Sequence, residues 1–205
     1  MTTLIIARHG NTFAPGDTPT RVGARTDLPL VEKGREQAQA LGRHLNDNRL
    51  IPDVIYTSHL KRTIETAEIA IKASKVSNPT FALDMFNEID YGPDENKPED
   101  EVIARIGQNA ITAWDEHATV PDGWKVDPEA IKQSWIDFAD QISAHDDNET
   151  VLVVTSNGTA RFAPYITGDF DDFSQQYTIK LSTGAFGMLK KENGLWRAQC
   201  WNVKP

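Results

Sequence analysis

The chain carries an Arg-His-Gly triplet directly after its first apolar run. Arg8, His9 and Gly10 follow Leu4-Ile5-Ile6-Ala7, a run typical of a strand buried on both faces of a parallel sheet. A residue that follows such a strand lies at the carboxyl edge of the sheet, where ligands bind. Imidazole can act there as a nucleophile or proton carrier, and arginine favours an anionic ligand. The pair is a candidate anion site, although an isolated Arg-His pair is more often structural.

Two further strand edges carry polar groups. Tyr56-Thr57-Ser58 leads into a helix with Arg62 in its first turn, where a cation opposes the helix dipole unless an anion is near. Asn157 and Gly158 begin another predicted helix, whose free N–H groups can receive an anion, with Asn157 as a cap. Alone, these features are compatible with a solvated arginine and a plain helix cap. Because the strand ends place Arg62, Asn157 and His9 at one edge of the sheet, the sequence predicts a phosphate pocket there.

Glu88 and the histidines are the other candidate reactive groups of the chain. Glu88 lies in Phe86-Asn87-Glu88-Ile89-Asp90-Tyr91-Gly92, after a weaker strand pattern. A carboxyl group beside a phosphate must be offset by arginines or be protonated, and either condition suits a general acid; a plain surface glutamate is the alternative. The five histidines show no H-E-x-x-H pattern or other dense ligand spacing, so we expect neither a metal site nor a cofactor.

The elements that must position these residues alternate between strands and helices. Besides residues 4–7, short apolar runs at 53–56 and 151–154 predict buried strands, and 80–83 is a weaker candidate. Amphipathic stripes predict helices around Ala38/Leu41/Leu45, Leu60/Ile64/Ala67/Ile71 and Ile131/Trp135/Phe138/Ile142. Glycine or Asn-Gly breaks separate three expected C-terminal strands, at 176–182, 185–189 and 195–201. The pattern predicts an α/β fold.

Two segments depart from this alternation. Residues 10–30 are rich in proline and glycine and predict a long loop after the first strand. Residues 90–128 mix acidic and proline-rich stretches with an expected helix from Glu99 to about Glu116, and they read as an excursion from the sheet. With 205 residues and no internal repeat, we expect a single domain over residues 1–205 that carries this excursion.

Net charge and hydropathy limit the classes of partner that the chain can bind. The formal net charge of −9 disfavours a grip on nucleic acid, and we expect none as a partner. No stretch approaches the roughly 20 apolar residues of a membrane span, and Arg8 interrupts the first apolar run before a signal peptide could form. We therefore expect a cytoplasmic protein without membrane contacts. The single Cys200 excludes an intrachain disulfide, and nothing in the sequence specifies the oligomeric state.

Taken in order, these motifs resemble the histidine phosphatase superfamily, also called phosphoglycerate mutase-like. The resemblance covers most of the chain, and it implies a three-layer sandwich with a mostly parallel central sheet flanked by helices. The segments that carry it are residues 4–12, residues 23–30 with Gly34 and Ala38, residues 56–67 and residues 87–92.

The resemblance also implies roles for individual residues. His9 would attack phosphorus and become a phosphohistidine, Arg8 and Arg62 would hold the phosphoryl oxygens, and Glu88 would protonate the leaving oxygen. Arg25 and Thr12 would line the same pocket.

Two positions depart from the family pattern. Asn157 stands where the family usually has a second histidine, and a neutral amide in place of a charged donor forfeits roughly 1–2 kcal/mol. Activity is therefore expected to be weakened but not excluded. Pro15 stands where many members carry a phosphate-contacting asparagine, a contact that Asn11 can replace.

These features predict a metal-independent phosphomonoester hydrolase that acts on a small phosphorylated metabolite. Two alternatives stay open. The first is a non-catalytic phospholigand-binding member of the same fold, which the changes at Asn157 and Pro15 would suit. The second is a phosphoglycerate mutase. Residues 90–128 contain only three basic residues, Lys97, Arg105 and Lys125, whereas mutases resembled here usually carry an arginine-rich insertion, and this favours hydrolysis.

Overall fold

A six-stranded sheet forms the centre of the molecule in the computed structural model, which describes residues 1–144 and 149–205. The strand order is β3-β2-β4-β1-β5-β6. The pairs β1–β4, β2–β4 and β2–β3 are parallel, whereas β5 runs antiparallel to both β1 and β6. The strands are β1 (Thr3–Arg8), β2 (Val54–Thr57), β3 (Thr80–Ala82), β4 (Thr150–Thr155), β5 (Phe186–Glu192) and β6 (Leu195–Val203).

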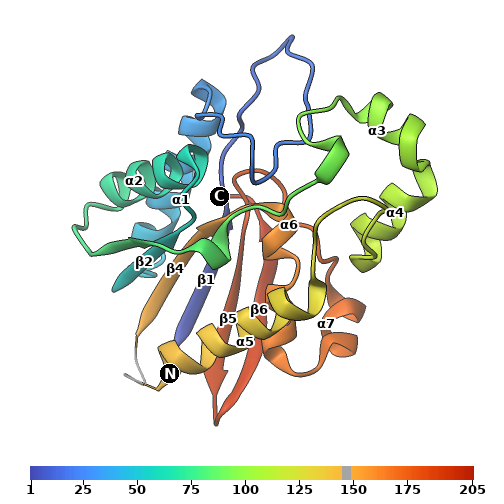
Figure 1. The fold of residues 1–205 in the computed structure, drawn as a ribbon. Helices are drawn as coiled ribbons and strands as arrows, with labels where there is room; N and C mark the ends of the chain where they lie inside the picture. The colour runs from blue at the N-terminus through green and yellow to red at the C-terminus, as the bar shows by residue number, and fades with distance from the viewer. Residues whose placement is uncertain (145–148) are drawn as a thin grey trace.

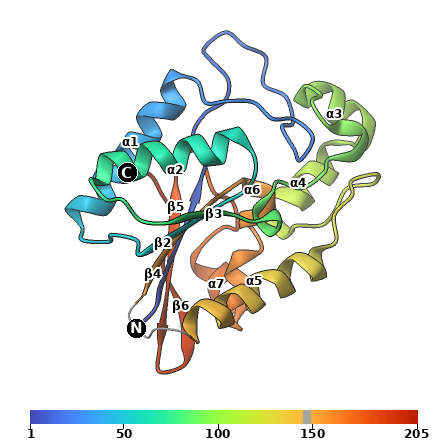
Figure 2. The same cartoon turned by 60° about the vertical axis from the view of Figure 1, so that its left-hand side comes forward.

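Helices cover both faces of this sheet (Figures 1 and 2). Helices α1 (Glu32–Asp47) and α2 (Lys61–Ser74) lie on one face, and α5 (Pro128–Ser143) and α7 (Phe170–Gln176) lie on the other. The short helix α6 (Asn157–Ala160) follows β4 directly, and 3₁₀ turns occupy Asp84–Phe86, Gly92–Asp94 and Ala163–Thr167. The predicted α/β architecture with a mostly parallel sheet is confirmed. None of the described helices combines the length and apolar character that crossing a bilayer requires.

The alternation of side chains along β1 divides the core into two layers. Ile5 and Ala7 pack with Leu41 of α1 and Ala67 of α2, while Leu4 and Ile6 belong to the layer that contains Trp135 and Phe138 of α5. All four β1 side chains are fully buried. Because both faces of β1 are covered by helices, the strand needs the continuous apolar run seen in the sequence.

Helix α2 buries a different face from the one that its apolar stripe predicts. Arg62, Thr63 and Thr66 are buried together with Ala67, Ala70 and Ser74, whereas Ile64 and Ile71 are only partly buried. Close contact with α1 explains the change, because a Cβ at Gly42 would lie 2.1 Å from the Ala70 carbonyl oxygen. Small residues allow this approach, and the rotation carries Arg62 inward instead of into solvent.

The C-terminal region contains one hairpin and not three separate strands. Strands β5 and β6 are joined at Asn193-Gly194, where both residues have positive φ, so the Asn-Gly turn signal is confirmed. The expected strand at 176–182 is wrong, because α7 extends to Gln176 and the chain then becomes irregular. The backbone there pairs with side chains instead of a neighbouring strand: Leu181 N–H donates to Asn157 Oδ1, and the Leu181 carbonyl accepts from Arg8.

The long loop and the excursion lie together beyond the carboxyl ends of the parallel strands (Figures 1 and 2). The excursion contains α3 (Glu99–Ile106) and α4 (Gln108–His117), so the single expected helix is wrong. Gly107 interrupts it with a φ of 84°, a conformation that favours glycine. An isolated bridge between Thr20 and Pro98 joins the loop to the excursion.

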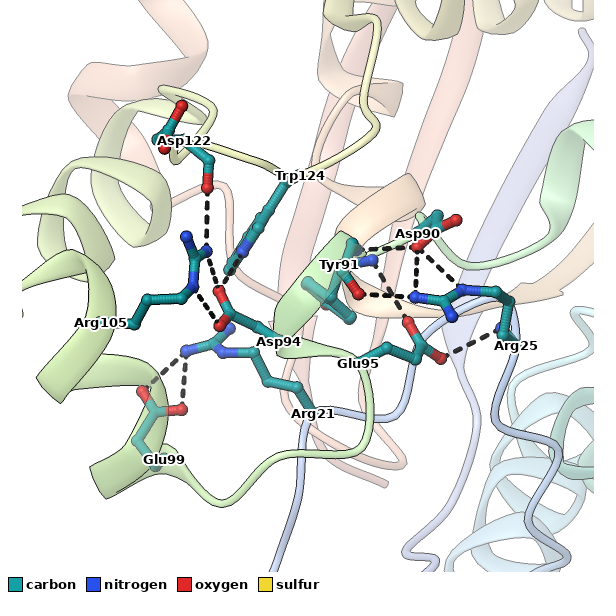
Figure 3. A network of polar contacts seen from close by, with 11 residues as sticks. Arg21, Arg25, Asp90, Tyr91, Asp94, Glu95, Glu99, Arg105, Asp122 and Trp124 are labelled. Atoms are coloured by element: carbon teal, nitrogen blue, oxygen red, sulfur yellow. Dashed lines mark hydrogen bonds and ion pairs between the residues drawn. The ribbon is translucent and has the colours of Figure 1, made fainter.

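A network of ion pairs fastens these two segments to one another (Figure 3). Arg21 donates to both carboxylate oxygens of Glu99 at 2.7 Å. Glu95 Oε1 accepts from the backbone N–H groups of Gly23 and Arg25, at 3.0 and 3.1 Å. Loop and excursion therefore act as one wall above the sheet edge.

Asp94 is the buried centre of the excursion. Its side chain accepts from Arg105 Nε at 2.6 Å and from Trp124 Nε1 at 2.7 Å, and the residue is 2% exposed (Figure 3). Burial favours the neutral acid, but the hydrogen bonds from Arg105 and Trp124 prevail and hold the pKa of Asp94 below its ordinary value. The charged carboxylate is therefore the form that stabilises the fold.

Asp94→Ala is expected to lower the free energy of unfolding by about 2–3 kcal/mol at pH 7, because it leaves a buried indole N–H and a guanidinium without their acceptor. Asp140→Ala, which removes an exposed carboxylate on α5, serves as the matched control. Urea denaturation measures the free energy of unfolding of the wild type and of each variant. Because the pKa of Asp94 is depressed in the folded protein, the difference in free energy of unfolding between wild type and Asp94→Ala should have its full size above about pH 4. The difference should shrink as the pH falls below that value. A difference that stays constant to pH 2.5 would contradict this account.

Candidate active site

A pocket of about 600 Å³ opens at the carboxyl edge of β1 and β4, below the loop and the excursion. Six of the residues singled out from the sequence line it: Arg8, His9, Asn11, Thr12, Glu88 and Asn157. They come from the carboxyl ends of β1 and β4 and from the segment after β3. The structure therefore brings together residues that are up to 149 positions apart in the chain.

His9 lies at the floor of this pocket with 6% of its surface exposed. Its Nδ1 is 2.8 Å from the Gly10 carbonyl oxygen, which can only accept a hydrogen bond. Nδ1 therefore carries the proton, and Nε2 keeps its lone pair. Burial, followed by the charges of Arg62 and Arg8, holds the pKa of His9 well below its ordinary value. The imidazole is neutral at pH 7, which is the form required of a nucleophile.

The backbone around His9 is held by strand β4 and by helices α1 and α2. His9 N–H donates to the Thr155 carbonyl at 3.0 Å, and Gly10 N–H donates to Thr66 Oγ1 at 3.1 Å. A Cβ at Gly10 would lie only 2.3 Å from the Gly34 carbonyl oxygen, so glycine is required for this approach. The imidazole is consequently presented from a rigid strand end.

Two arginines surround His9 with incompletely used donors. Arg8 donates through NH1 to the Leu181 carbonyl at 2.8 Å, and fully buried Arg62 donates to the carbonyls of Thr26 and Gly23. The Nε atoms of both arginines are buried without a hydrogen-bond partner among the described residues. Arg62 does not itself line the pocket, but its charge reaches His9 and Glu88. Unpaired buried donors of this kind mark a position for an anion.

Glu88 enters the pocket from the segment after β3. Its Oε1 accepts from Ile89 N–H at 2.9 Å, and its Oε2 accepts from Gly158 N–H at 3.2 Å, which fixes the carboxyl group against the start of α6. Gly158 must be glycine, since a Cβ would lie 2.3 Å from Glu88 Oε1. Gly158 does not line the pocket. Its N–H, which the sequence suggested for a phosphate, is directed at Glu88 instead.

Asn157 and Asn11 present amides to the same space. Asn157 Oδ1 accepts from Leu181 N–H at 2.8 Å, which leaves the Nδ2 donors for the pocket. Asn11 Oδ1 is buried without a hydrogen-bond partner among the described residues. Pro15 lies at the exposed rim and offers no side-chain donor. Asn11 therefore supplies a side-chain amide in the part of the pocket where Pro15 has none.

Arg25 lies outside the pocket, contrary to the expectation from the sequence. Its Nε donates to Asp90 Oδ1 at 3.1 Å and its NH2 donates to the Gly92 carbonyl at 2.6 Å (Figure 3). Asp90 and the excursion backbone draw the guanidinium away from His9. Arg21 takes the place on the pocket wall instead.

Sequence reasoning missed several pocket residues, above all Arg161. It is 1% exposed and lines the pocket together with Trp114, Asp115 and Lys180. Its guanidinium lies 3.9 Å from the centroid of the Trp114 ring. The available signal was a lone arginine just before the apolar Phe162-Ala163-Pro164 segment, where a solvated side chain would be out of place.

The arrangement suits an anion that is attacked by His9. The neutral imidazole of His9, Arg8 with its unused donor and the oriented carboxyl group of Glu88 line one space, and the charge of buried Arg62 acts on His9. Within residues 1–144 and 149–205, no group of three His, Cys, Asp or Glu residues is placed to hold a metal ion. His145 lies outside the described residues. The groups present can bind a phosphoryl group, accept it at Nε2 and exchange a proton.

Comparison with known families gives one match across the chain. The model of the histidine phosphatase superfamily (branch 1) matches residues 4–204. Among curated relatives, the 2,3-bisphosphoglycerate-dependent phosphoglycerate mutase of Tropheryma whipplei (strain Twist) is 32% identical over 115 residues. That alignment covers 56% of this chain and 51% of the relative, so the chain spans about half the length of the curated relatives it matches.

Solved structures match over nearly the whole chain. Bacillus stearothermophilus YhfR has a TM-score of 0.77 at 25% identity, covering 98% of this chain and 97% of that one. Phosphoserine phosphatase from Entamoeba histolytica, solved in complex with 3-phosphoglyceric acid, has a TM-score of 0.77 at 18% identity and covers 99% and 98%. The second likeness shows the shared fold alone.

Proposed function

Since the chain belongs to the histidine phosphatase superfamily, we propose that it is a metal-independent phosphomonoesterase that forms a phosphohistidine at His9. The observation that carries this proposal is the state of His9. The imidazole lines the pocket, donates through Nδ1 to the Gly10 carbonyl and is kept neutral by burial and by Arg62 and Arg8, which lower its pKa. Nε2 is then the atom available for attack.

The first half-reaction follows from this geometry. Nε2 of His9 forms a bond to phosphorus as the bond between phosphorus and the ester oxygen breaks. Glu88 gives its proton to that oxygen, and the alcohol leaves. Arg8 and Arg62 supply positive charge where negative charge is concentrated on the phosphoryl oxygens.

The second half-reaction regenerates the enzyme. Glu88, now a carboxylate, takes a proton from water; the water oxygen bonds to phosphorus and the N–P bond breaks. Inorganic phosphate leaves, and His9 is again neutral. The same carboxyl group thus serves as acid and then as base.

The excursion supports hydrolysis over phosphoglycerate mutase activity. Its three basic residues are each engaged within the excursion: Arg105 with Asp94, Lys97 with Glu101 and Lys125 with Asp90. None of the three lines the pocket. A mutase must retain a bisphosphorylated intermediate, and the excursion offers no unengaged cation for that purpose. A coupled assay with 2,3-bisphosphoglycerate should show no interconversion of phosphoglycerates.

A substrate panel tests the proposal directly. Incubation with chromogenic and natural phosphate monoesters in the presence of a chelator should release inorganic phosphate, and rapid quenching should trap an acid-labile, base-stable phosphoryl group on His9. Tight binding of phosphate esters with no turnover and no label would favour the alternative, a non-catalytic phospholigand-binding protein.

Asn157→His is expected to raise kcat by about 5- to 30-fold, because a charged donor replaces a neutral one near the transferring group. The position suits the exchange, since the Asn157 amide is already oriented toward the pocket by Leu181. Asn48→His, an exposed position at the end of α1, serves as control. Steady-state kinetics with one phosphate ester measures kcat for the wild type and for both variants. An unchanged or lower rate in a folded variant would mean that the pocket is built around the amide.

A further inference from the structure

Gln37 of α1 binds the backbone that directly follows His9. Its Oε1 accepts from the Asn11 N–H at 2.8 Å, and its Nε2 donates to the Thr183 carbonyl at 3.3 Å. Because a carbonyl oxygen can only accept a hydrogen bond, these two contacts give the Gln37 amide a single orientation, with Oε1 toward Asn11. Gln37 does not line the pocket, and neither half-reaction uses it.

Gly184 packs against the stem of the Gln37 side chain. It has a φ of 71°, and a Cβ there would lie 2.8 Å from Gln37 Cβ. The Gly184 N–H donates to the His9 carbonyl at 3.1 Å, so the segment that confines Gln37 is itself bonded to His9. The amide is therefore held in place from two sides, by helix α1 and by residues 183–184.

One peptide group links Gln37 to the ring of His9. The Gly10 carbonyl, 2.8 Å from His9 Nδ1, and the Asn11 N–H belong to the same planar peptide. The Nδ1 proton bonds to one end of this peptide, and Gln37 Oε1 accepts at the other end. Hydrogen bonds in such a chain polarise one another, so the contact with Gln37 makes the Gly10 carbonyl a better acceptor for His9.

The other contacts of this segment hold the neighbouring peptides. Thr66 Oγ1 accepts from the Gly10 N–H, and the Asn11 carbonyl accepts from the Val31 N–H. Neither bond fixes the rotation of the Gly10–Asn11 peptide plane. That plane is bonded to His9 on one side and to Gln37 on the other, so loss of the Gln37 amide would free it to turn.

Resting on the proposed phosphohistidine mechanism, we propose that Gln37 is a positioning residue for His9. By holding and polarising the Gly10–Asn11 peptide, it keeps the imidazole proton on Nδ1 and leaves the lone pair on Nε2 for attack on phosphorus. In a neutral histidine, the hydrogen bond of one ring nitrogen decides which of the two carries the proton. Gln37 lies outside the pocket, so its effect on the reaction passes through His9.

Gln37→Met removes the amide and keeps most of the side-chain volume. We expect kcat to fall about tenfold because the imidazole is less firmly oriented, while KM stays within about twofold because Gln37 does not line the pocket. Gln37→Glu keeps an acceptor oxygen for the Asn11 N–H in either protonation state and should restore most of the lost rate. Gln39→Met and Gln39→Glu make the same changes at an exposed position of α1 and should leave both constants unchanged.

The proton NMR resonance of His9 Nδ1–H reports on the hydrogen bond to Gly10 directly. We expect it to move upfield in Gln37→Met, where that bond is weaker, and to stay at or downfield of the wild-type position in Gln37→Glu. Its absence from the spectrum of His9→Ala assigns it among the histidines. A general loss of packing would not be reversed by the glutamate, so the order of the two variants separates positioning from a merely structural role.

If Gln37→Met does not fold, Gln37→Asn takes its place, because the shorter side chain withdraws the amide from Asn11. A folded Gln37→Met or Gln37→Asn protein that kept the wild-type resonance position would overturn the proposal. A shift that Gln37→Glu failed to reverse, or a wild-type kcat in the methionine variant of an active enzyme, would overturn it as well.

The resonance needs no turnover, which separates this proposal from the proposed function. If the wild type hydrolyses no ester and traps no phosphohistidine while the resonance responds in the expected order, the phosphatase is lost and the link from Gln37 to His9 stands. If the wild type forms the phosphohistidine and Gln37→Met matches it in kcat and in resonance position, the link is lost and the phosphatase stands.

Discussion

His9→Ala is expected to lower kcat for phosphate monoesters by about 10⁴-fold or more and to abolish the acid-labile phosphoryl label. Alanine removes the only protein atom that forms a bond to phosphorus in the proposed reaction, and water cannot occupy the same oriented position. The buried Nδ1 contact to Gly10 is local, so the fold should persist. Activity with p-nitrophenyl phosphate and label retention after base quenching give the two readouts.

His59→Ala is the matched control, because His59 is exposed and pairs with Asp84 outside the pocket. It should leave both kcat and the label unchanged. A folded His9→Ala protein that kept more than about a hundredth of the wild-type rate would show that another group or a bound water performs the attack. The pocket would then remain a phosphate site, but the covalent mechanism would be lost.

The strands and the position of Arg8 and His9 at the end of β1 could be predicted because their signals are local. Residues 4–7 are apolar without interruption since both sides of β1 are covered, and His9 must then lie at the strand end. The Asn193-Gly194 turn fixes the last hairpin for a similar reason. In each case the residues that carry the signal also carry the structure.

The orientation of side chains between distant segments could not be predicted in the same way. Loop residues 10–30 contain Arg21 and Arg25, and nothing in their own neighbourhood says which one faces the pocket. The orientations are set by the excursion, where Asp90 binds Arg25 and Glu99 binds Arg21 (Figure 3). Residues about 70 positions away thus decide the composition of the pocket wall.

The prediction that the apolar stripe of α2 is its buried face was wrong for a related reason. A stripe assumes that burial follows hydrophobicity, but the buried face of α2 is set by its contact with α1 at Gly42 and by hydrogen bonds to the strand edge, such as that from Gly10 N–H to Thr66. Arg62 is buried because backbone carbonyls of Gly23 and Thr26 accept from it. Polar burial of this kind identifies a site, and it is invisible to periodicity.

Glu88→Gln is expected to lower kcat for alkyl phosphates, such as glycerol 3-phosphate, by about 10²- to 10⁴-fold. An alkoxide is a poor leaving group without a proton, and the amide cannot supply one. For p-nitrophenyl phosphate, whose phenolate leaves readily without protonation, the fall should be much smaller. The diagnostic quantity is the ratio of the two effects, which a purely structural role would not change.

Glu99→Gln provides the comparison, since Glu99 also lines the pocket and carries the same charge but pairs with Arg21. It should affect both classes of ester to the same extent. If Glu88→Gln slowed both classes equally, Glu88 would act only by holding α6 through the Gly158 N–H, and the proton would have to come from another group. Unequal slowing confined to poor leaving groups places the proton on Glu88, because only that step distinguishes the two esters.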